Sequence, residues 1–269
     1  MSANHEGNDR KRPWDPRRGK GGSPHGKRPQ SASESESRDW LWGWHAVESA
    51  LANPARPTPK RLLVTADRAA RLAKHGSLVE IVENNEIIKR LPQGAVHQGV
   101  ALQTPPLEPV DIDELGTPAK GFIVMLDQIT DPQNVGALFR SAAAFGARGV
   151  ILQDRNAPLL TGTLAKAAAG AIDRIPHAAV VNLSRALERL ADLGWRAVGL
   201  DGNAESDLAD ALDGQPTVLV LGSEGEGIRR LVAEHCDTLA KIPMPGGFES
   251  LNVSAAGAIA LYEASKPRP

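Results

Sequence analysis

Three stretches of the chain carry polar residues of the kinds that bind ligands or assist reactions. The first, residues 126–141, contains Asn134 and Arg140. Asp131 followed by Pro132 predicts a helix start, which would place Asn134 in a first turn with free backbone amides and Arg140 on the side away from the core. An arginine there could stabilise a developing negative charge. The same spacing also fits an ordinary solvated arginine.

The second stretch, residues 222–230, is rich in glycine and follows an apolar run at residues 217–221. Its glycines, Gly222 among them, allow a tight turn and the close approach of a ligand to the backbone. The spacing matches neither the dinucleotide-binding nor the phosphate-loop signature, and Glu224 and Glu226 would repel phosphates. A neutral or cationic ligand against glycine backbone is the better interpretation.

The third stretch, residues 242–254, places two prolines and two glycines beside small polar side chains. Proline fixes the backbone and glycine admits a neighbouring group, while Ser250, Asn252 and Ser254 offer hydrogen bonds without charge. Such a rigid strand-to-helix connection could close a ligand pocket. The alternative is an ordinary strand, a turn and an N-capped helix.

Alternating strand and helix signals from residue 121 onward would position these three stretches. Continuous apolar runs at 122–126 and 217–221 are typical of parallel strands that are buried on both faces. The spacing predicts further strands at 149–152, 176–181, 196–200 and 239–242, and helices at 132–145, 162–171, 184–193, 207–212, 228–236 and 251–264. This order predicts an α/β fold with a mostly parallel sheet, helices on both faces and ligands at the carboxyl ends of the strands.

The chain before residue 121 has a different organisation. Residues 1–38 have few aliphatic side chains, and segment 10–28 holds eight basic residues against one acid. We expect a disordered basic tail that either binds polyanions or keeps the protein in solution. A small α/β domain is predicted at 39–103, a proline-rich linker at 104–118 with a short helical turn at 112–115, and the larger domain at 119–269.

Within the small domain the pattern predicts three helices and two strands. The helices are expected at 46–52, 68–73 and 78–82, and the strands at 61–65 and 96–102. Trp40, Trp42 and Trp44 could stack on nucleic-acid bases. A place in the core or at a domain edge is the favoured interpretation.

Composition disfavours several function classes. A net charge of -1 argues against a uniformly basic nucleic-acid binder. Cys236 is the single cysteine, so no intrachain disulfide is possible, and a small buried residue is expected there. The lack of a long apolar run and of a signal-peptide core predicts a cytoplasmic protein with no membrane segment. No histidine or cysteine cluster has metal-ligand spacing, so no metal is expected.

Taken together, the three stretches resemble the motifs of the SpoU (TrmH-like) family of RNA ribose 2′-O-methyltransferases in the SPOUT superfamily. Motif one lies at residues 126–140, motif two at 219–225 and motif three at 242–254. The segments Gly43-x-His45 and His97-Gln98-Gly99 extend the resemblance to the small domain. That domain is similar to the RNA-recruiting domain of bacterial large-subunit rRNA guanosine methyltransferases. Residues 1–38 have no counterpart.

The resemblance implies features that composition and spacing do not. It implies a trefoil knot in the carboxyl-terminal part of the sheet and a homodimer with the active site at the subunit interface. It implies S-adenosylmethionine as the cofactor, held by backbone groups of Gly222, Ile242 and Leu251. The implied substrate is RNA, namely a guanosine of large-subunit rRNA, with tRNA as the alternative. An RNA-binding or ribosome-assembly protein that has lost catalysis is a third possibility.

The implied reaction is a metal-independent transfer of methyl to a ribose 2′-hydroxyl. Arg140 would stabilise the developing alkoxide and hold a phosphate, because arginine stays protonated at neutral pH. Asn134 and Asn252 would orient the pocket and Arg140. Ser250 would hold the cofactor or its loop, and Glu224 the motif-two turn. The conformation of residues 245–249 is left open.

Overall fold

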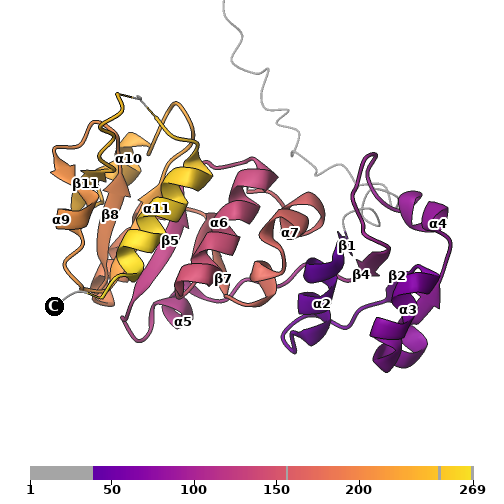
Figure 1. Cartoon of the computed structure of the whole chain (residues 1–269). Coiled ribbons are helices and arrows are strands. Elements are labelled where there is room, and N and C mark those ends of the chain that lie inside the picture. The colour runs from indigo at the N-terminus through magenta and orange to yellow at the C-terminus, as the bar shows by residue number, and fades with distance from the viewer. Residues whose placement is uncertain (1–38, 156, 248–249, 268–269) are drawn as a thin grey trace, which may run out of the picture. The chain divides into compact units, whose positions relative to one another are not determined.

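Two β-sheets organise the computed structural model, which describes residues 39–155, 157–247 and 250–267 (Figure 1). A four-stranded sheet lies in residues 39–103, here called the N-terminal region, and a seven-stranded sheet in residues 119–267, the C-terminal region. The described residues fall within one compact unit. None of their helices is both long and apolar enough to span a membrane.

The N-terminal region is a small α/β unit, as predicted. In chain order it contains β1 Trp40–Trp42, α2 Trp44–Ala52, β2 Arg61–Val64, α3 Ala66–Leu72, the 3-10 helix η1 Ala73–Leu78, β3 Val79–Ile81, α4 Asn84–Ile88 and β4 Val100–Gln103. The strand order is β1-β4-β2-β3. Strand β4 is antiparallel to both of its neighbours, and β2 is parallel to β3.

The helix expected at residues 78–82 is wrong, because this segment contains strand β3. Val79 pairs with Leu62 of β2 in parallel register. A short apolar run does not distinguish helix from strand by its period, and β-branched side chains such as Val79 favour the strand when a partner is available.

The strand expected at residues 96–102 starts later, at Val100. Gln98 and Gly99 have φ angles of 57° and 79°, so their backbone is left-handed and cannot continue an extended strand. In this polar turn, Gln98 accepts a hydrogen bond from Lys166 of the C-terminal region.

The C-terminal region confirms the predicted alternation of strands and helices. Its elements, with α5 just before them, are α5 Ile112–Gly116, β5 Phe122–Leu126, α6 Pro132–Phe145, β6 Val150–Gln153, α7 Gly162–Ala168, the 3-10 helix η2 Ala171–Asp173, β7 His177–Val180, α8 Leu183–Asp192, β8 Arg196–Leu200, β9 Ser206–Asp207, α9 Leu208–Ala211, β10 Thr217–Leu221, α10 Arg230–Ala233, β11 Thr238–Lys241 and α11 Val253–Ser265. The strand order is β7-β6-β5-β10-β8-β11-β9. Every described pairing in this sheet is parallel.

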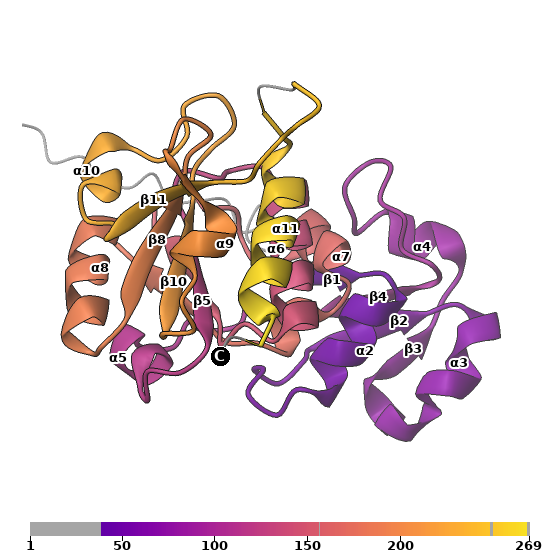
Figure 2. The same ribbon diagram turned by 60° about the vertical axis from the view of Figure 1, so that its left-hand side comes forward.

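Helices cover both faces of the large sheet, as Figure 2 shows with α6 and α11 on one side and α8 and α10 on the other. Alternate residues of one strand point to opposite faces. In β5, Val124 and Leu126 join the core under α6 and α11, whereas Ile123 and Met125 join the core under α8. All four side chains are buried, which explains the continuous apolar run in the sequence.

Helix α6 begins and ends at the residues that the sequence predicts. The Asp131 side chain accepts a hydrogen bond from the Gln133 amide, and Pro132 occupies the first turn. Gly146 ends the helix with a left-handed φ of 78°. This helix carries Asn134 near the carboxyl edge of the sheet and Arg140 further along.

Two helices near the site are shorter than predicted. The helix expected at 228–236 spans only Arg230–Ala233, since Arg229 is extended and its amide donates to Asp127 rather than entering a helix. Helix α11 starts at Val253, after Asn252 as its N-cap, rather than at residue 251. In both cases a backbone amide at the helix start donates to a carboxylate at the site, Arg229 to Asp127 and Val253 to Glu224.

The segment at residues 104–118 is packed rather than loose. Thr104 is fully buried, the Val110 amide donates to the His177 carbonyl, and the short helix expected at 112–115 is present as α5. The assignment of separate domains at 39–103 and 119–269 stays a prediction.

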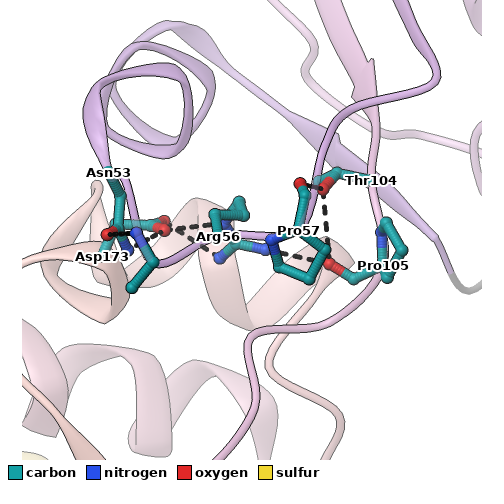
Figure 3. A network of polar contacts seen from close by, with 7 residues as sticks. Asn53, Arg56, Pro57, Thr104, Pro105 and Asp173 are labelled. Carbon is teal, nitrogen blue, oxygen red and sulfur yellow. Dashed lines mark hydrogen bonds and ion pairs between the residues drawn. The ribbon is translucent and has the colours of Figure 1, made fainter.

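Buried contacts join the two regions. Arg56, in the loop after α2, forms a two-pronged ion pair with Asp173 of η2, at 2.6 and 3.0 Å, and also donates to the Pro105 carbonyl (Figure 3). The two side chains are only 1% and 4% exposed. Trp42 is buried and its ring lies against Gly162 of α7. The interpretation of Trp40 and Trp42 as core or domain-edge residues is therefore confirmed.

His177, at the start of β7, is buried, and its Nδ1 atom has no hydrogen-bond partner among the described residues. Burial, and to a smaller extent the Arg56 cation, lowers the pKa of His177 from 6.5 to about 4. Between these values the unfolded chain binds a proton that the folded chain excludes. Lowering the pH from 7 to 5 should therefore decrease the free energy of unfolding by about 2 kcal/mol.

Urea unfolding at the two pH values measures this loss. The variant His177→Leu should lose markedly less stability over the same interval. An equal loss in both proteins would assign the pH dependence to other groups.

Candidate functional site

A cavity of about 940 Å³ lies at the carboxyl ends of β8, β10 and β11. The glycine-rich segment after β10 and the segment between β11 and α11 form much of its wall. Its lining residues are Leu200, Asp201, Gly202, Asn203, Leu221, Gly222, Ser223, Glu224, Gly225, Glu226, Gly227, Ile228, Ala240, Lys241, Ile242, Pro243, Met244, Ser250, Leu251, Val253 and Ala256. Two of the three stretches singled out in the sequence therefore meet here.

The loop after β10 is a tight backbone turn. Ser223 and Gly227 exchange two backbone hydrogen bonds of 3.1 and 3.0 Å. A Cβ atom on Gly222 would lie 2.0 Å from the Gly227 carbonyl carbon, so only glycine fits at residue 222. The loop can therefore present backbone groups to the cavity at close range.

Glu224 joins the three stretches. Its Oε1 atom accepts hydrogen bonds from Asn134 Nδ2 at 3.2 Å, from Asn252 Nδ2 at 2.7 Å and from the Val253 amide at 3.2 Å. Asn252 Nδ2 also donates to Asn134 Oδ1 at 3.0 Å. The contacts of Glu224 thus reach motifs one and three. Glu224 was expected to hold the motif-two turn, but the backbone hydrogen bonds between Ser223 and Gly227 close that turn.

Asn252 has a second role as the N-cap of α11. Its Oδ1 atom accepts from the amides of Ser254 and Ala255 at 3.0 and 3.3 Å. The Asn252 side chain therefore caps α11 through its oxygen and contacts Glu224 through its nitrogen. The capped helix, one of the two alternatives in the sequence, is present, and residues of the same stretch line the cavity; their binding of a ligand stays a prediction.

The three predicted cofactor-binding residues all line the cavity, as does Ser250. Gly222 belongs to the glycine-rich loop after β10, and Ile242 and Leu251 belong to the segment between β11 and α11. In the neighbouring loop, the Gly247 amide donates to the Met244 carbonyl. Of the segment 245–249 whose conformation was left open, residues 248–249 lie outside the described residues.

Arg140 does not line the cavity. It is exposed on α6, six residues after Asn134, which corresponds to about 9 Å along the helix axis. Val135 is buried, so the expected placement of Arg140 away from the core is confirmed. Within the part of the chain that the structure describes, Arg140 has no hydrogen-bond or ion-pair partner, and the contacts of Asn134 and Asn252 do not reach it.

Asp127 is a site residue that the sequence reading did not single out. It follows β5, is fully buried, and accepts from the Arg229 amide at 2.8 Å and from its Nε at 2.7 Å. The pair fixes the end of the glycine-rich loop to motif one. The sequence signal that could have identified Asp127 is an acidic residue directly after a buried strand.

The chemistry of the cavity wall is neutral to acidic. Glu224, Glu226 and Asp201 contribute carboxylates, against Lys241 as the basic lining residue. Cys236 lies apart from the wall and packs against the core under α8, but it is half-buried rather than buried as expected; burial raises its pKa to about 12. Among the described residues no group of three or more His, Cys, Asp or Glu could hold a metal ion. The wall suits a cationic ligand better than a phosphate.

Comparison with known protein families gives two matches. Residues 121–262 match the SpoU rRNA Methylase family, which is more than half of the 269-residue chain. Residues 40–110 match the family described as RNA 2'-O ribose methyltransferase substrate binding.

Comparison with individual proteins agrees with these two family matches. A Synechocystis sp. protein, named an uncharacterized tRNA/rRNA methyltransferase, is 37% identical over 252 residues, or 88% of this chain and 65% of that protein. The chain spans about three-fifths to two-thirds of the length of the curated relatives it matches.

Two solved structures are similar in fold. The SpoU methyltransferase AviRb from Streptomyces viridochromogenes has a TM-score of 0.72 and 24% identity, covering 86% of this chain and 91% of that one. An AdoMet-bound rRNA methyltransferase from Sinorhizobium meliloti has 0.69 and 25%, covering 86% and 88%.

Proposed function

The chain belongs to the SpoU rRNA methylase family, and on this premise we propose that it methylates RNA at a ribose 2′-hydroxyl with S-adenosylmethionine. The observation that carries the proposal is the junction of the three motifs beside one cavity. Glu224 of motif two binds Asn134 of motif one and Asn252 of motif three at hydrogen-bond distance. Residues that lie far apart in the chain are thus brought together next to a pocket of cofactor size.

The cavity suits this cofactor. S-adenosylmethionine supplies an electrophilic methyl group on a sulfonium cation. The carboxylates of Asp201, Glu224 and Glu226 in the wall favour a cation, and the glycine loop at Gly222 leaves backbone groups accessible. Gly222, Ile242 and Leu251 are the residues that we assign to cofactor binding, with Ser250 on the adjoining wall.

We assign Arg140 to the contact with the RNA, which accepts the methyl group. Its side chain is exposed and unpaired within the described residues, so it can approach a ribose and its phosphate. Arginine stays protonated at neutral pH. It would therefore stabilise the alkoxide that develops as the 2′-hydroxyl loses its proton to a phosphate or to water. Since Arg140 supplies this charge, the proposed reaction is metal-independent.

We further propose a homodimer in which the partner subunit helps to complete the active site. Arg140 lies outside the cavity, and the nearby surface of α6 and α11 has exposed apolar side chains. Ile259 and Tyr262 of α11 are 42% and 53% exposed, and the Tyr262 ring packs 5.8 Å from that of Phe145 of α6. An exposed apolar patch next to an incomplete site is typical of a subunit interface. The trefoil knot rests on the family resemblance and stays a prediction.

The proposed substrate is a guanosine of large-subunit rRNA, with tRNA as the alternative. The N-terminal region supports a large substrate, because it matches a substrate-binding family and adds a second surface beside the catalytic region. Buried contacts such as Arg56 with Asp173 hold this region in place. A fixed second surface would help to select one nucleotide in a large folded RNA.

The cofactor assignment predicts the effect of a methyl group at Gly222. Gly222→Ala should weaken S-adenosylmethionine binding at least about tenfold, because the new Cβ would lie 2.0 Å from the Gly227 carbonyl carbon and force the loop apart. Isothermal titration calorimetry measures this. Val181→Ala is the control, since Val181 is exposed and lies outside the cavity. Normal binding by Gly222→Ala would contradict the assignment of the cavity, and no binding by the wild-type protein would contradict the proposed function.

A further inference from the structure

A polar patch lies where the two regions meet, away from the cavity. We call it the junction patch and define it as Trp44, Arg71, Gln98 and Lys166. Arg71 of α3 places its guanidinium carbon 3.9 Å from the centroid of the Trp44 ring. The Trp44 amide donates to Gln98 Oε1 at 3.0 Å, and Lys166 Nζ of α7 donates to the same oxygen at 2.6 Å. One continuous set of contacts therefore links an aromatic ring, two cations and both regions.

Unusual backbone geometry holds the junction patch in place. Gln98 has a φ of 57°, which is uncommon for a residue with a side chain. Gly43, just before α2, has a φ of 89°, and a Cβ on it would lie 2.6 Å from Cδ of Lys166. The chain thus uses a left-handed glutamine and an obligatory glycine to fix Lys166 against the N-terminal region. Strain of this kind concentrates at functional positions.

The two cations of the patch lack anionic partners. In the described part of the chain neither Arg71 nor Lys166 has a carboxylate within ion-pair distance, unlike Arg56 with Asp173. Burial lowers the pKa of Lys166, which shows that its ammonium is partly desolvated without a compensating charge. An anion placed beside it would remove that cost.

On the basis of the proposed function, we propose that the junction patch binds a single-stranded segment of the RNA substrate. A base stacks on the outer face of the Arg71 guanidinium, and a neighbouring phosphate contacts Lys166. The indole beneath Arg71 holds the guanidinium plane in position, so little side-chain entropy is lost when a base stacks on it. Arginine planes and aromatic rings are the surfaces on which proteins stack unpaired bases.

The geometry favours unpaired over paired RNA. A duplex keeps its base faces stacked inside the helix, so it could use the charges of Arg71 and Lys166 but not the flat guanidinium surface. A segment with an unstacked base uses both features. The patch would then bind a loop or bulge while the target ribose lies at the cavity.

Fluorescence anisotropy with short labelled RNAs and the full chain, without cofactor, tests the proposal. The probes are an oligoadenylate and an oligomer of the same length that lacks bases. Arg71→Lys keeps the charge but loses the plane, so it should weaken binding of oligoadenylate about tenfold and leave the abasic oligomer unchanged. Lys166→Gln should weaken binding of both probes. Lys89→Ala is the control, because Lys89 is an exposed lysine of the same region outside the patch.

Binding of oligoadenylate by Arg71→Lys and Lys166→Gln at the wild-type level would overturn the proposal, as would equal losses in Lys89→Ala. Equal losses by Arg71→Lys on both probes would replace base stacking with simple charge attraction and overturn the stacking step. Methyl transfer is measured separately on the wild-type protein. If the patch variants lose RNA binding while the wild-type protein methylates no RNA, the proposed function fails and the patch stands.

Discussion

Replacing Arg140 by alanine should lower the rate of methyl transfer to RNA at least about a hundredfold. The affinity for S-adenosylmethionine should change less than about twofold. The reason is the position of Arg140, which lies outside the cavity and has no partner among the described residues. Its loss would remove the positive charge beside the developing alkoxide and leave the cofactor pocket intact. Single-turnover methylation and calorimetry measure the two quantities.

Two further variants make this result specific. Arg140→Lys keeps the charge without the planar fork and should retain an intermediate rate. Arg174→Ala removes an exposed arginine from the same region, at the end of η2, and should methylate at the wild-type rate. Wild-type activity in Arg140→Ala would contradict the role that we assign. A parallel loss of cofactor affinity would mean that Arg140 supports the pocket instead.

The second large effect concerns stability. Asp173→Ala should lower the free energy of unfolding by about 3 to 5 kcal/mol, because it leaves the Arg56 guanidinium buried without its partner. The Arg56 side chain is 1% exposed, and its Nε atom lies 2.6 Å from Asp173 Oδ1. Asn53 Nδ2 would also lose its acceptor. Urea unfolding followed by circular dichroism measures the change.

The double variant Arg56→Met with Asp173→Ala distinguishes the lost pair from the lost packing. Removing both charges should recover part of the stability, so the double variant should unfold at a higher urea concentration than Asp173→Ala. Asp213→Ala is the control, because Asp213 pairs with Arg196 at a side-chain exposure of 40% and should cost less than about 1 kcal/mol. If Asp173→Ala costs no more than this control, the buried pair does not hold the regions together.

Much of the fold followed from local patterns. The apolar run at residues 122–126 indicated a strand buried on both faces, and Asp131, Pro132 and Gly146 marked both ends of α6. These signals succeed because they depend on neighbouring residues alone. Strand β9 and helix α4 were not predicted, because two and five residues are too few to establish a period.

The parts of the site that the sequence did not predict are contacts between distant residues. Glu224 looked like a turn residue, yet its partners are Asn134 and Asn252, which lie 90 and 28 residues away. Asp127 is fixed to Arg229, 102 residues on. Residue types limited the candidates for these pairs, but the parallel sheet, which brings the ends of β5 and β10 side by side, selected them.

The proposed knot, the homodimer and the target nucleotide came from the family resemblance rather than from these patterns. A knot is a property of how the whole chain passes through itself and has no local signature. A homodimer depends on a second copy, to which the exposed Ile259 and Tyr262 only point. The substrate depends on RNA contacts that residue types alone do not specify.

The central claim is that the cavity and Arg140 together serve methyl transfer to a ribose 2′-hydroxyl. The most direct measurement incubates the protein with S-adenosylmethionine carrying an isotopically labelled methyl group and with unmodified rRNA or tRNA. Digestion to nucleosides and mass spectrometry then locate the label. Our account predicts labelled 2′-O-methylguanosine from large-subunit rRNA, formed by the wild-type protein and not by Arg140→Ala. Label on a base, or no label in any RNA although the cofactor binds, would contradict it.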